Sequence, residues 1–180
     1  MNNKTGVVTF PCFTHEQVRE INKEIKKNIL GREQQSIAAQ NTSKIGDFFH
    51  VPCLSLMEWL HPWLYKCQQA NKKVFGYDTY WNFHLDTFNY NVYGLNDEYG
   101  WHIDAFNDTL PSDIKLTCLL NLSEESHEGG EFCTVNQYEK IEFDSGMGLV
   151  FNSLIAHKIT PITKGKRTTL TYWADGPSWR

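Results

Sequence analysis

From Trp81 onward the chain reads as a series of short β-strands separated by turns that contain glycine. The pattern predicts eight strands, at about 81–92, 101–105, 114–122, 130–135, 140–143, 147–152, 155–160 and 167–174. Turn-forming pairs lie between several of them, at Gly129-Gly130, Ser145-Gly146 and Lys164-Gly165. Eight short strands joined by turns are typical of a jelly roll, so we expect a mostly β fold of this type.

We expect N-terminal helices to support the jelly roll. They are predicted within about residues 1–76, and the jelly-roll core at about 80–175. Thr14 followed by Gln17 is a capping box, in which each side chain bonds the backbone N–H of the other residue. A helix is therefore predicted after Thr14, ending at Gly31. Its apolar residues recur near helical spacing, at Val18, Ile21 and Ile25.

A second helix is predicted to start at Pro62, because proline suits the first turn of a helix. Its apolar positions are Leu64, Cys67, Ala70 and Val74. Both helices are expected to pack on one sheet and to take no part in chemistry. The segment 31–47 between them is rich in Gln, Asn and Ser, which predicts a surface loop. At one end of a jelly roll, such a loop could also act as a lid over a substrate.

The length and composition fit a compact globular protein. A chain of 180 residues can bury a sizeable core, and 41% apolar with 14% aromatic residues exclude a disordered chain. We expect residues 1–180 to form a single domain. The net charge of −4 disfavours a protein that coats nucleic acid, because such proteins carry a positive surface.

The five cysteines are odd in number and lack metal-ligand spacing. Small secreted domains held by disulfides usually have an even number of cysteines. The N-terminal residues lack the apolar stretch of a signal peptide, and no run reaches the ~18 apolar residues needed to span a membrane. We therefore expect a cytoplasmic protein without membrane association.

His102 and Asp104 are candidate metal ligands. Side chains alternate between the two faces of a β-strand, so these two residues point the same way while Ile103 points oppositely. The apolar segment that ends at His157 is a candidate source of a third ligand. Two histidines and one carboxylate on one side of a metal leave coordination positions open, which suits non-haem Fe(II) and oxygen chemistry.

The triplet His84-Leu85-Asp86 has the same local form, so a His-x-Asp pair alone does not locate a metal site. The residues that alternate with this pair are apolar: Trp81, Phe83 and Leu85. We therefore expect the apolar side of this segment to face the core, and His84 and Asp86 to face solvent. Aromatic residues gather before the second pair, at Tyr93, Tyr99 and Trp101. They suggest the mouth of a pocket, so we assign the metal to His102 and Asp104.

Arg167 opens the last predicted strand, ten residues after His157. Alternation places four residues on one face of that strand: Arg167, Thr169, Thr171 and Trp173. A planar guanidinium can grip a carboxylate through two parallel hydrogen bonds, and a neighbouring hydroxyl can add another. Arg167 is therefore a candidate anchor for a dicarboxylate co-substrate held against the metal.

Three stretches of the chain, in this order, resemble the prolyl 4-hydroxylase-like branch of the 2-oxoglutarate/Fe(II) oxygenase superfamily. They are YGLNDEYGWHID at 93–104, LNLSEESHEGGEF at 120–132 and GMGLVFNSLIAHKITPITKGKRTTLTYW at 146–173. The resemblance covers about residues 80–175 and implies a double-stranded β-helix, the jelly roll of this superfamily.

The resemblance also implies the roles of the site residues. Fe(II) would lie on His102, Asp104 and His157, and Arg167 would hold the distal carboxylate of 2-oxoglutarate. Further candidate contacts to the co-substrate are Tyr93, Thr169 and Thr171. O2 would be the second co-substrate, and ascorbate is a candidate reductant. Some relatives carry a co-substrate-binding tyrosine where this chain has Asn121, so the secondary contact stays unassigned.

The implied reaction is hydroxylation of an unactivated C–H bond, coupled to oxidative decarboxylation of 2-oxoglutarate. Peptidyl proline is the first candidate substrate, so a peptide or protein is the expected partner. The expected cytoplasmic location favours an intracellular protein over secreted collagen. The sequence does not name the substrate or the oligomeric state.

Three alternatives stay open at this point. The first is an oxygenase that acts on a free amino acid or another small metabolite. The second is a nucleobase demethylase. The stretch RTTLTYW is close to the C-terminal pattern of those enzymes, although it ends in Trp173 where they place a second arginine. The third is a non-catalytic jelly-roll binding module or a zinc-bound structural domain. Retention of the three ligands and Arg167 speaks against this last reading.

Overall fold

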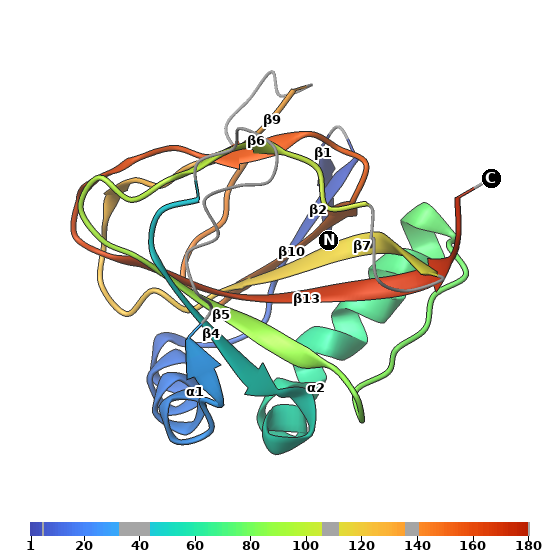
Figure 1. Cartoon of the computed structure of the whole chain (residues 1–180), viewed down its shortest axis with the longest axis horizontal. Helices are drawn as coiled ribbons and strands as arrows, with labels where there is room; N and C mark the ends of the chain where they lie inside the picture. The colour runs from blue at the N-terminus through green and yellow to red at the C-terminus, as the bar shows by residue number, and fades with distance from the viewer. Residues whose placement is uncertain (5, 33–43, 106–111, 136–140, 180) are drawn as a thin grey trace.

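The computed structural model describes residues 1–4, 6–32, 44–105, 112–135 and 141–179 (Figure 1). Its helical segments are α1 (His15–Lys27), α2 (Cys53–Ala70) and the π-helical turn η1 (Asn71–Phe75). The first strands are β1 (Asn2–Lys4), β2 (Val7–Pro11), β3 (Gly31–Arg32), β4 (Asp47–Pro52), β5 (Thr87–Tyr93) and β6 (Tyr99–His102). The later strands are β7 (Ser112–Asn121), β8 (Glu128–Gly129), β9 (Phe132–Thr134), β10 (Met147–Asn152), β11 (His157–Ile159), β12 (Ile162–Lys164) and β13 (Arg167–Pro177).

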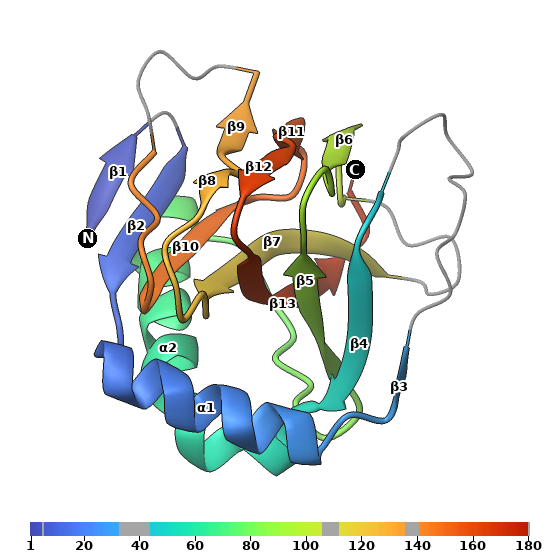
Figure 2. The same ribbon diagram turned by 90° about the vertical axis from the view of Figure 1, so that its left-hand side faces the viewer.

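The strands form a large sheet and a small sheet that face each other. The large sheet has eight strands in the order β1-β2-β10-β7-β13-β5-β4-β3, and the small one has the order β6-β11-β9. A further pair joins β12 to β8, and all strand pairs are antiparallel. Figure 2 shows α1 and α2 on one side of the large sheet and the small sheet on the other. This is the predicted mostly β jelly roll with supporting helices.

One face of the large sheet forms the main core with the helices. Alternate residues of its central strands point toward α2, among them Val150, Leu120 and Tyr172, and all are buried. The helix supplies Leu56, Leu60, Trp63 and Leu64 to the same cluster. Since apolar burial contributes roughly 25 cal/mol per Å², this layer is the main source of stability.

The opposite face of the large sheet, which points into the barrel, is unusually polar. Its buried polar side chains include Asn89, Asn91, Thr117, Arg167, Thr169 and Thr171. Buried polar groups are costly unless they find partners, so this polar part of the barrel interior indicates a binding site. It lies beside a second apolar cluster on the same face, which includes Leu119, Leu149 and Phe151.

Helix α1 begins as the sequence predicts but ends earlier. The Gln17 backbone N–H donates to Thr14 Oγ1 at 3.3 Å, and the Thr14 N–H donates to Gln17 Oε1 at 2.9 Å, which confirms the capping box. The helix ends at Lys27, and Asn28 caps it by donating its N–H to the Ile25 carbonyl. The prediction that Gly31 ends the helix is wrong. Gly31 instead pairs with His50 of β4, so this residue is part of the sheet and not the end of the helix.

Helix α2 starts at Cys53, not at Pro62 as predicted. Pro52 precedes its first turn, and Pro62 lies inside the helix with its ring exposed. An interior proline destabilises a helix by about 3 kcal/mol. Burial of Leu56 and Leu60, which precede Pro62, and of Trp63, which follows it, outweighs that cost. Val74, predicted on the apolar face of this helix, is 40% exposed in η1.

The N-terminal region also supplies strands, which the sequence analysis missed. β1, β2 and β4 complete the large sheet, so residues 1–76 are not helical support alone. The predicted loop 31–47 contains β3 and the first residue of β4. Most of it, residues 33–43, lies outside the described residues, and so does the lid interpretation.

Several predicted strand boundaries are also wrong. The strand predicted at 81–92 starts only at Thr87, because residues 83–85 form a turn. The segment 130–135 contributes only Phe132–Thr134, and 155–160 only His157–Ile159. Residues 141–143, predicted as part of a strand, belong to no strand, while Ile162–Lys164, predicted partly as a turn, forms β12.

Candidate active site

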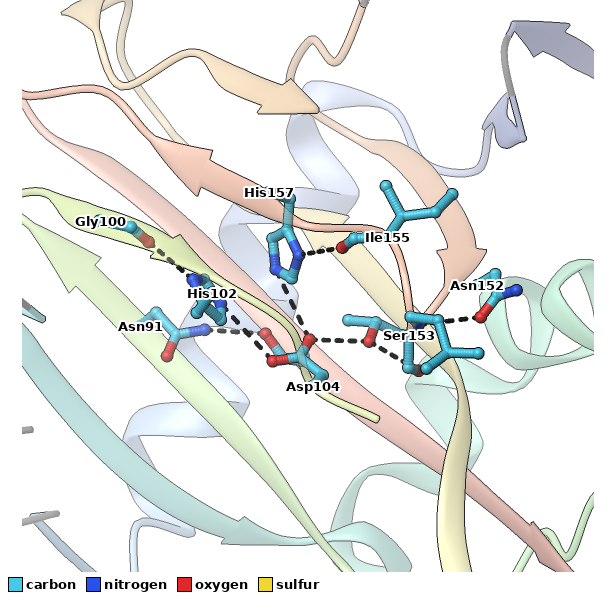
Figure 3. A network of polar contacts seen from close by, with 11 residues as sticks. Asn91, Gly100, His102, Asp104, Asn152, Ser153, Ile155 and His157 are labelled. Atoms are coloured by element: carbon cyan, nitrogen blue, oxygen red, sulfur yellow. Dashed lines mark hydrogen bonds and ion pairs between the residues drawn. The ribbon is translucent and has the colours of Figure 1, made fainter. Parts of the chain in front are cut away.

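The predicted metal ligands meet where the small sheet faces the large one (Figure 3). His102 on β6 lies directly opposite His157 on β11 in the antiparallel register. His102 Nε2 lies 3.5 Å from Asp104 Oδ1, and His157 Nε2 lies 3.6 Å from Asp104 Oδ2. One ligand atom from each residue lies within 4.8 Å of the other two. Among the described residues, this is the one group of histidine, cysteine and acidic side chains with such geometry.

Backbone carbonyls set the orientation of both imidazoles. His102 Nδ1 lies 2.8 Å from the Gly100 carbonyl oxygen, and His157 Nδ1 lies 2.9 Å from that of Ile155. A carbonyl only accepts hydrogen bonds, so each Nδ1 carries the proton. Each Nε2 therefore presents a lone pair toward Asp104, the arrangement that metal-binding histidines commonly show.

Asp104 is held by the neighbouring strands. Its Oδ2 accepts a hydrogen bond of 2.8 Å from Thr117 Oγ1 on β7, and its backbone N–H donates to the Ser153 carbonyl at 3.0 Å. Thr117 also lies 3.2 Å from Ser153 Oγ. Ile103, between the two ligands, is 42% exposed, and His102 and Asp104 point to the same site as predicted. The strand predicted at 101–105 is wrong in its bounds, because β6 ends at His102 and Asp104 lies beyond it. The carboxylate is thus fixed toward the two histidines.

The environment keeps His102 neutral. Burial lowers the pKa of His102 to about 4, and the nearby His157 strengthens this effect, while Asp104 opposes it. The ring of Tyr99 stacks on His102 with centroids 3.5 Å apart and an interplanar angle of 11°. A neutral imidazole is the form that binds a metal. Two histidines and one carboxylate are a donor set that suits Fe(II) with open positions.

The triad lines a small cavity of about 40 Å³ between the two sheets. The facing wall is β13, whose inward residues all line this cavity: Arg167, Thr169, Thr171 and Trp173. This confirms that the four share one face. The cavity also includes Tyr93, Tyr99 and Asn91. Trp101 does not line it, because it points to the outer face of β6 and is 47% exposed.

Arg167 is the main cation of this wall and lacks an anionic partner among the described residues. It is 2% exposed, its Nη2 has no hydrogen-bond partner there, and its guanidinium lies 5.5 Å from the Tyr93 ring centroid. Burial lowers the pKa of Arg167 to about 10, which still leaves it charged at neutral pH. Leaving a buried charged donor unpaired is costly, so this side chain fits a carboxylate ligand.

The other predicted co-substrate contacts form a hydrogen-bonded group next to Arg167. Asn91 Nδ2 donates to Thr171 Oγ1 at 2.9 Å and lies 3.4 Å from Thr169 Oγ1. Tyr93 on β5 is in register with Arg167. All of them line the triad cavity, so the structure brings these residues together. Asn91 was missed because its position on a buried strand carries no local signal of a site.

Asn121 has a structural role in this chain. Its Nδ2 donates to the Phe143 carbonyl at 2.6 Å, and its Oδ1 accepts from the Ser123 N–H at 2.9 Å. It lies on a larger cavity of about 1090 Å³ beside β8 and β9, which contains none of the triad residues. Arg167 lines both cavities. We locate the candidate site at the smaller one, because the donor set lies there.

The first His-x-Asp triplet is not a ligand pair in this structure. His84 lies in a turn and is exposed, as predicted. Asp86 was predicted to face solvent, and this prediction is wrong. Its Oδ2 accepts a hydrogen bond of 2.8 Å from Tyr172 Oη. Leu85, predicted in the core, is 88% exposed. The turn at 83–85 breaks the alternation on which both predictions rested.

Residues 88–175 match the family model described as 2OG-Fe(II) oxygenase superfamily. That span begins in β5 and includes the triad and Arg167. The chain belongs to the 2OG-Fe(II) oxygenase superfamily. Fe(II) and 2-oxoglutarate are the cofactor and co-substrate that this family implies.

The superfamily match agrees with similar proteins. A PKHD-type hydroxylase of Alteromonas mediterranea is 35% identical over 68 residues, which is 37% of this chain and 30% of that protein. A PKHD-type hydroxylase of Shewanella frigidimarina is 30% identical over 68 residues, with the same coverage. The match thus spans about a third of the length of these relatives.

Solved structures of the superfamily share the fold. A viral collagen prolyl hydroxylase from Paramecium bursaria Chlorella virus-1, in complex with 2OG, aligns with a TM-score of 0.70 and 16% identity. The alignment covers 96% of this chain and 97% of that chain. A Pseudomonas putida prolyl-4-hydroxylase aligns with a TM-score of 0.64 and 17% identity, over 96% and 94% of the two chains. The double-stranded β-helix is therefore confirmed.

No described helix combines the length and apolar character needed to cross a bilayer. The expected cytoplasmic location and the single-domain organisation stay predictions.

Proposed function

We propose that this superfamily member is an Fe(II)- and 2-oxoglutarate-dependent dioxygenase that hydroxylates an unactivated C–H bond. One observation carries the proposal. Two Nε2 lone pairs and the Asp104 carboxylate converge in the same cavity as the buried Arg167 guanidinium, whose Nη2 is unpaired among the described residues. A structural zinc site would account for the converging histidines and Asp104, but not for the buried Arg167 guanidinium beside them.

Each residue then has a defined task. His102, Asp104 and His157 would hold Fe(II), and Arg167 would bind the distal carboxylate of 2-oxoglutarate with its planar fork. When bound, the iron and its co-substrates supply the oxidising power for C–H hydroxylation. Thr117 keeps the Asp104 carboxylate turned toward the histidines, and the Gly100 and Ile155 carbonyls keep each Nε2 unprotonated.

Peptidyl proline is the substrate that we propose for this reaction. Similar structures support this choice, because they include prolyl hydroxylases, and one of these, from Trichoplax adhaerens, was solved with a peptide fragment of hypoxia inducible factor. The expected partner is accordingly a peptide or protein.

Co-substrate turnover tests the proposal. Purified protein with Fe(II), 2-oxoglutarate and ascorbate should form succinate faster when proline-containing peptides are present, and the peptide should gain about 16 Da at proline, the mass of the single oxygen that a hydroxylation adds. Stimulation by free amino acids but by no peptide would favour the small-metabolite alternative. Stimulation by methylated oligonucleotides would favour a nucleobase demethylase. Absence of any 2-oxoglutarate binding to metal-loaded protein would leave a non-catalytic module.

A further inference from the structure

The cavity at the triad is small for the co-substrate that it is proposed to hold. Its volume is about 40 Å³, and a single water molecule takes roughly 30 Å³ of liquid. Pockets that bind small molecules usually measure about 300–1,000 Å³. The cavity therefore has to gain space from a neighbouring part of the barrel when a 2-oxo diacid enters between the metal and Arg167.

Two side chains separate this cavity from the larger one of about 1090 Å³. Phe132 and Arg167 line both cavities, and no other residue in the described part of the chain does so. Phe132 is 4% exposed on β9, and its ring centroid lies 5.6 Å from that of His157. The larger cavity thus begins where the triad cavity ends, and a shift of these two side chains joins them.

Small residues lie on the side of Arg167 that faces the larger cavity. Gly130 is so close that a Cβ atom there would be 2.9 Å from Arg167 Cδ, so the absence of a side chain leaves room for the arginine stem. The Phe143 ring centroid lies 5.9 Å from Arg167 Cζ, and Asn121 is held against the Phe143 carbonyl by its amide. Arg167 Nη2 has no hydrogen-bond partner among the described residues. The guanidinium can therefore move toward the larger cavity without breaking a hydrogen bond of that nitrogen.

The charge of the larger cavity determines how a diacid can use this space. Carboxylates line much of it, on Glu124, Glu125, Glu128, Glu131, Glu142 and Asp144. Its lysine and arginine side chains, within the described residues, are Lys158 and Arg167. Like charges repel a carboxylate that no cation holds. The distal carboxylate of a longer diacid should therefore stay on Arg167, and the two should shift together.

We propose that the co-substrate site extends past Phe132 toward the larger cavity, so that this chain also accepts 2-oxoadipate, which is one methylene longer than 2-oxoglutarate. The inference rests on the proposed function, which assigns Arg167 to the distal carboxylate. Oxidative decarboxylation converts 2-oxoadipate to glutarate and CO2. One oxygen atom of O2 enters glutarate, and the other enters the hydroxylated substrate.

Binding to zinc-loaded protein tests the extension without turnover. Calorimetry gives the Kd of 2-oxoglutarate and of 2-oxoadipate. In a site that fits one acid closely, one methylene changes discrimination roughly 10- to 200-fold, so 2-oxoadipate should bind less than about tenfold more weakly than 2-oxoglutarate. A larger difference would overturn the proposal. Failure to bind 2-oxoglutarate would instead refute the proposed function, and this inference with it.

Turnover with Fe(II) tests the role as co-substrate. Glutarate release from 2-oxoadipate should reach the rate of succinate release from 2-oxoglutarate within about tenfold. Succinate release without any glutarate release would overturn the proposal. Absence of both products would refute the proposed function.

Two variants of Asn121 locate the space. Asn121→Tyr places a ring in the larger cavity, whereas Asn121→Leu keeps nearly the size of asparagine. Both lose the hydrogen bonds to Phe143 and Ser123. The tyrosine variant should weaken 2-oxoadipate relative to 2-oxoglutarate by about tenfold or more, and the leucine variant should keep the wild-type ratio of the two Kd values. Equal ratios in the two variants would overturn the proposal.

Phe132→Leu provides an independent check that does not depend on the Asn121 variants. It shortens the side chain between the cavities, so the Kd of 2-oxoadipate should fall relative to that of 2-oxoglutarate. Lys158→Met is the matched control, because Lys158 lines the larger cavity, with Nζ 5.1 Å from the Trp101 ring centroid, and does not line the triad cavity. It should keep the wild-type ratio. An unchanged ratio in Phe132→Leu would overturn the assignment of Phe132 to the boundary of the site.

Discussion

Two His-x-Asp triplets of this chain share one local pattern but have different surroundings in the structure. His102 and Asp104 bracket an exposed Ile103 at the end of β6, and their side chains meet at 3.5 Å. His84 and Asp86 bracket an exposed Leu85 in a turn, and Asp86 instead accepts a hydrogen bond from Tyr172. Within the part of the chain that the structure describes, only His102 and Asp104 have a third candidate ligand near them, His157.

The difference comes from the strand that lies alongside. β11 pairs with β6 so that His157 faces His102, and β7 supplies Thr117 to Asp104. The segment before β5 has no strand partner at His84, and its Asp86 serves the packing of the large sheet on α2. A ligand pair therefore becomes a metal site only when long-range pairing brings further donors to the same face.

The largest expected effect concerns the two aspartates. Asp104→Ala removes a ligand, so metal affinity should fall by at least about 100-fold and 2-oxoglutarate turnover should be lost, since even outer partners of ligands contribute 10–100-fold. Asp86→Ala should keep both properties. Calorimetric titration with Zn(II) and succinate formation with Fe(II) measure them. Full turnover in Asp104→Ala would reverse the assignment of the two pairs.

Arg167 distinguishes the surroundings of His102 and Asp104 from those of His84 and Asp86, because it makes the first a candidate co-substrate site. A buried charged hydrogen bond is worth roughly 1.5–3 kcal/mol, so Arg167→Ala should raise the KM for 2-oxoglutarate at least about tenfold. Arg167→Lys should recover part of this loss, because lysine keeps the charge but lacks the planar fork. The Zn(II) affinity of both variants should match wild type. An unchanged KM in Arg167→Ala would remove this residue from the site.

Thr117 tests whether support from β7 matters for the metal site. Thr117→Val keeps the shape of the side chain and removes the hydrogen bond to Asp104 Oδ2. We expect metal affinity to fall by about tenfold, since hydrogen bonds to ligands typically contribute 10–100-fold. Thr117→Ser, which keeps the hydroxyl, should stay near wild type. Equal affinities in the valine and serine variants would show that the bond is not needed.

Asp86→Asn should have the smallest effect and should act on stability alone. Burial raises the pKa of Asp86, so the ionised form costs more in the folded protein than in the unfolded chain. This cost is absent below the unfolded pKa and grows as pH rises through the folded pKa. The free energy of unfolding of Asp86→Asn should therefore depend less on pH than that of the wild type. Relative to the wild type, the variant should gain less than about 1 kcal/mol of stability at pH 7 compared with pH 3.5. Urea unfolding at both pH values measures the change, and a matching loss of Zn(II) affinity would contradict the structural role.

Much of the site follows from local rules that the sequence obeys. Strand alternation placed Arg167, Thr169, Thr171 and Trp173 on one face, and all four line the cavity. The capping box at Thr14 is also a local feature, since both of its hydrogen bonds close within four residues. Such predictions succeed because the relevant partners are close in the chain.

The sequence by itself determined the donor set, the strand-rich core and the face on which each β13 side chain lies. Only the tertiary structure decided which strands are neighbours, that α2 continues through Pro62, that Asp86 turns inward, and that Phe132 and Arg167 line both cavities. Periodicity encodes the face of an element and carries no information about what packs against that face. Those choices depend on burial and hydrogen bonds between distant segments, such as Asn91 with Thr171 or Thr117 with Asp104, which form only once the sheets have assembled.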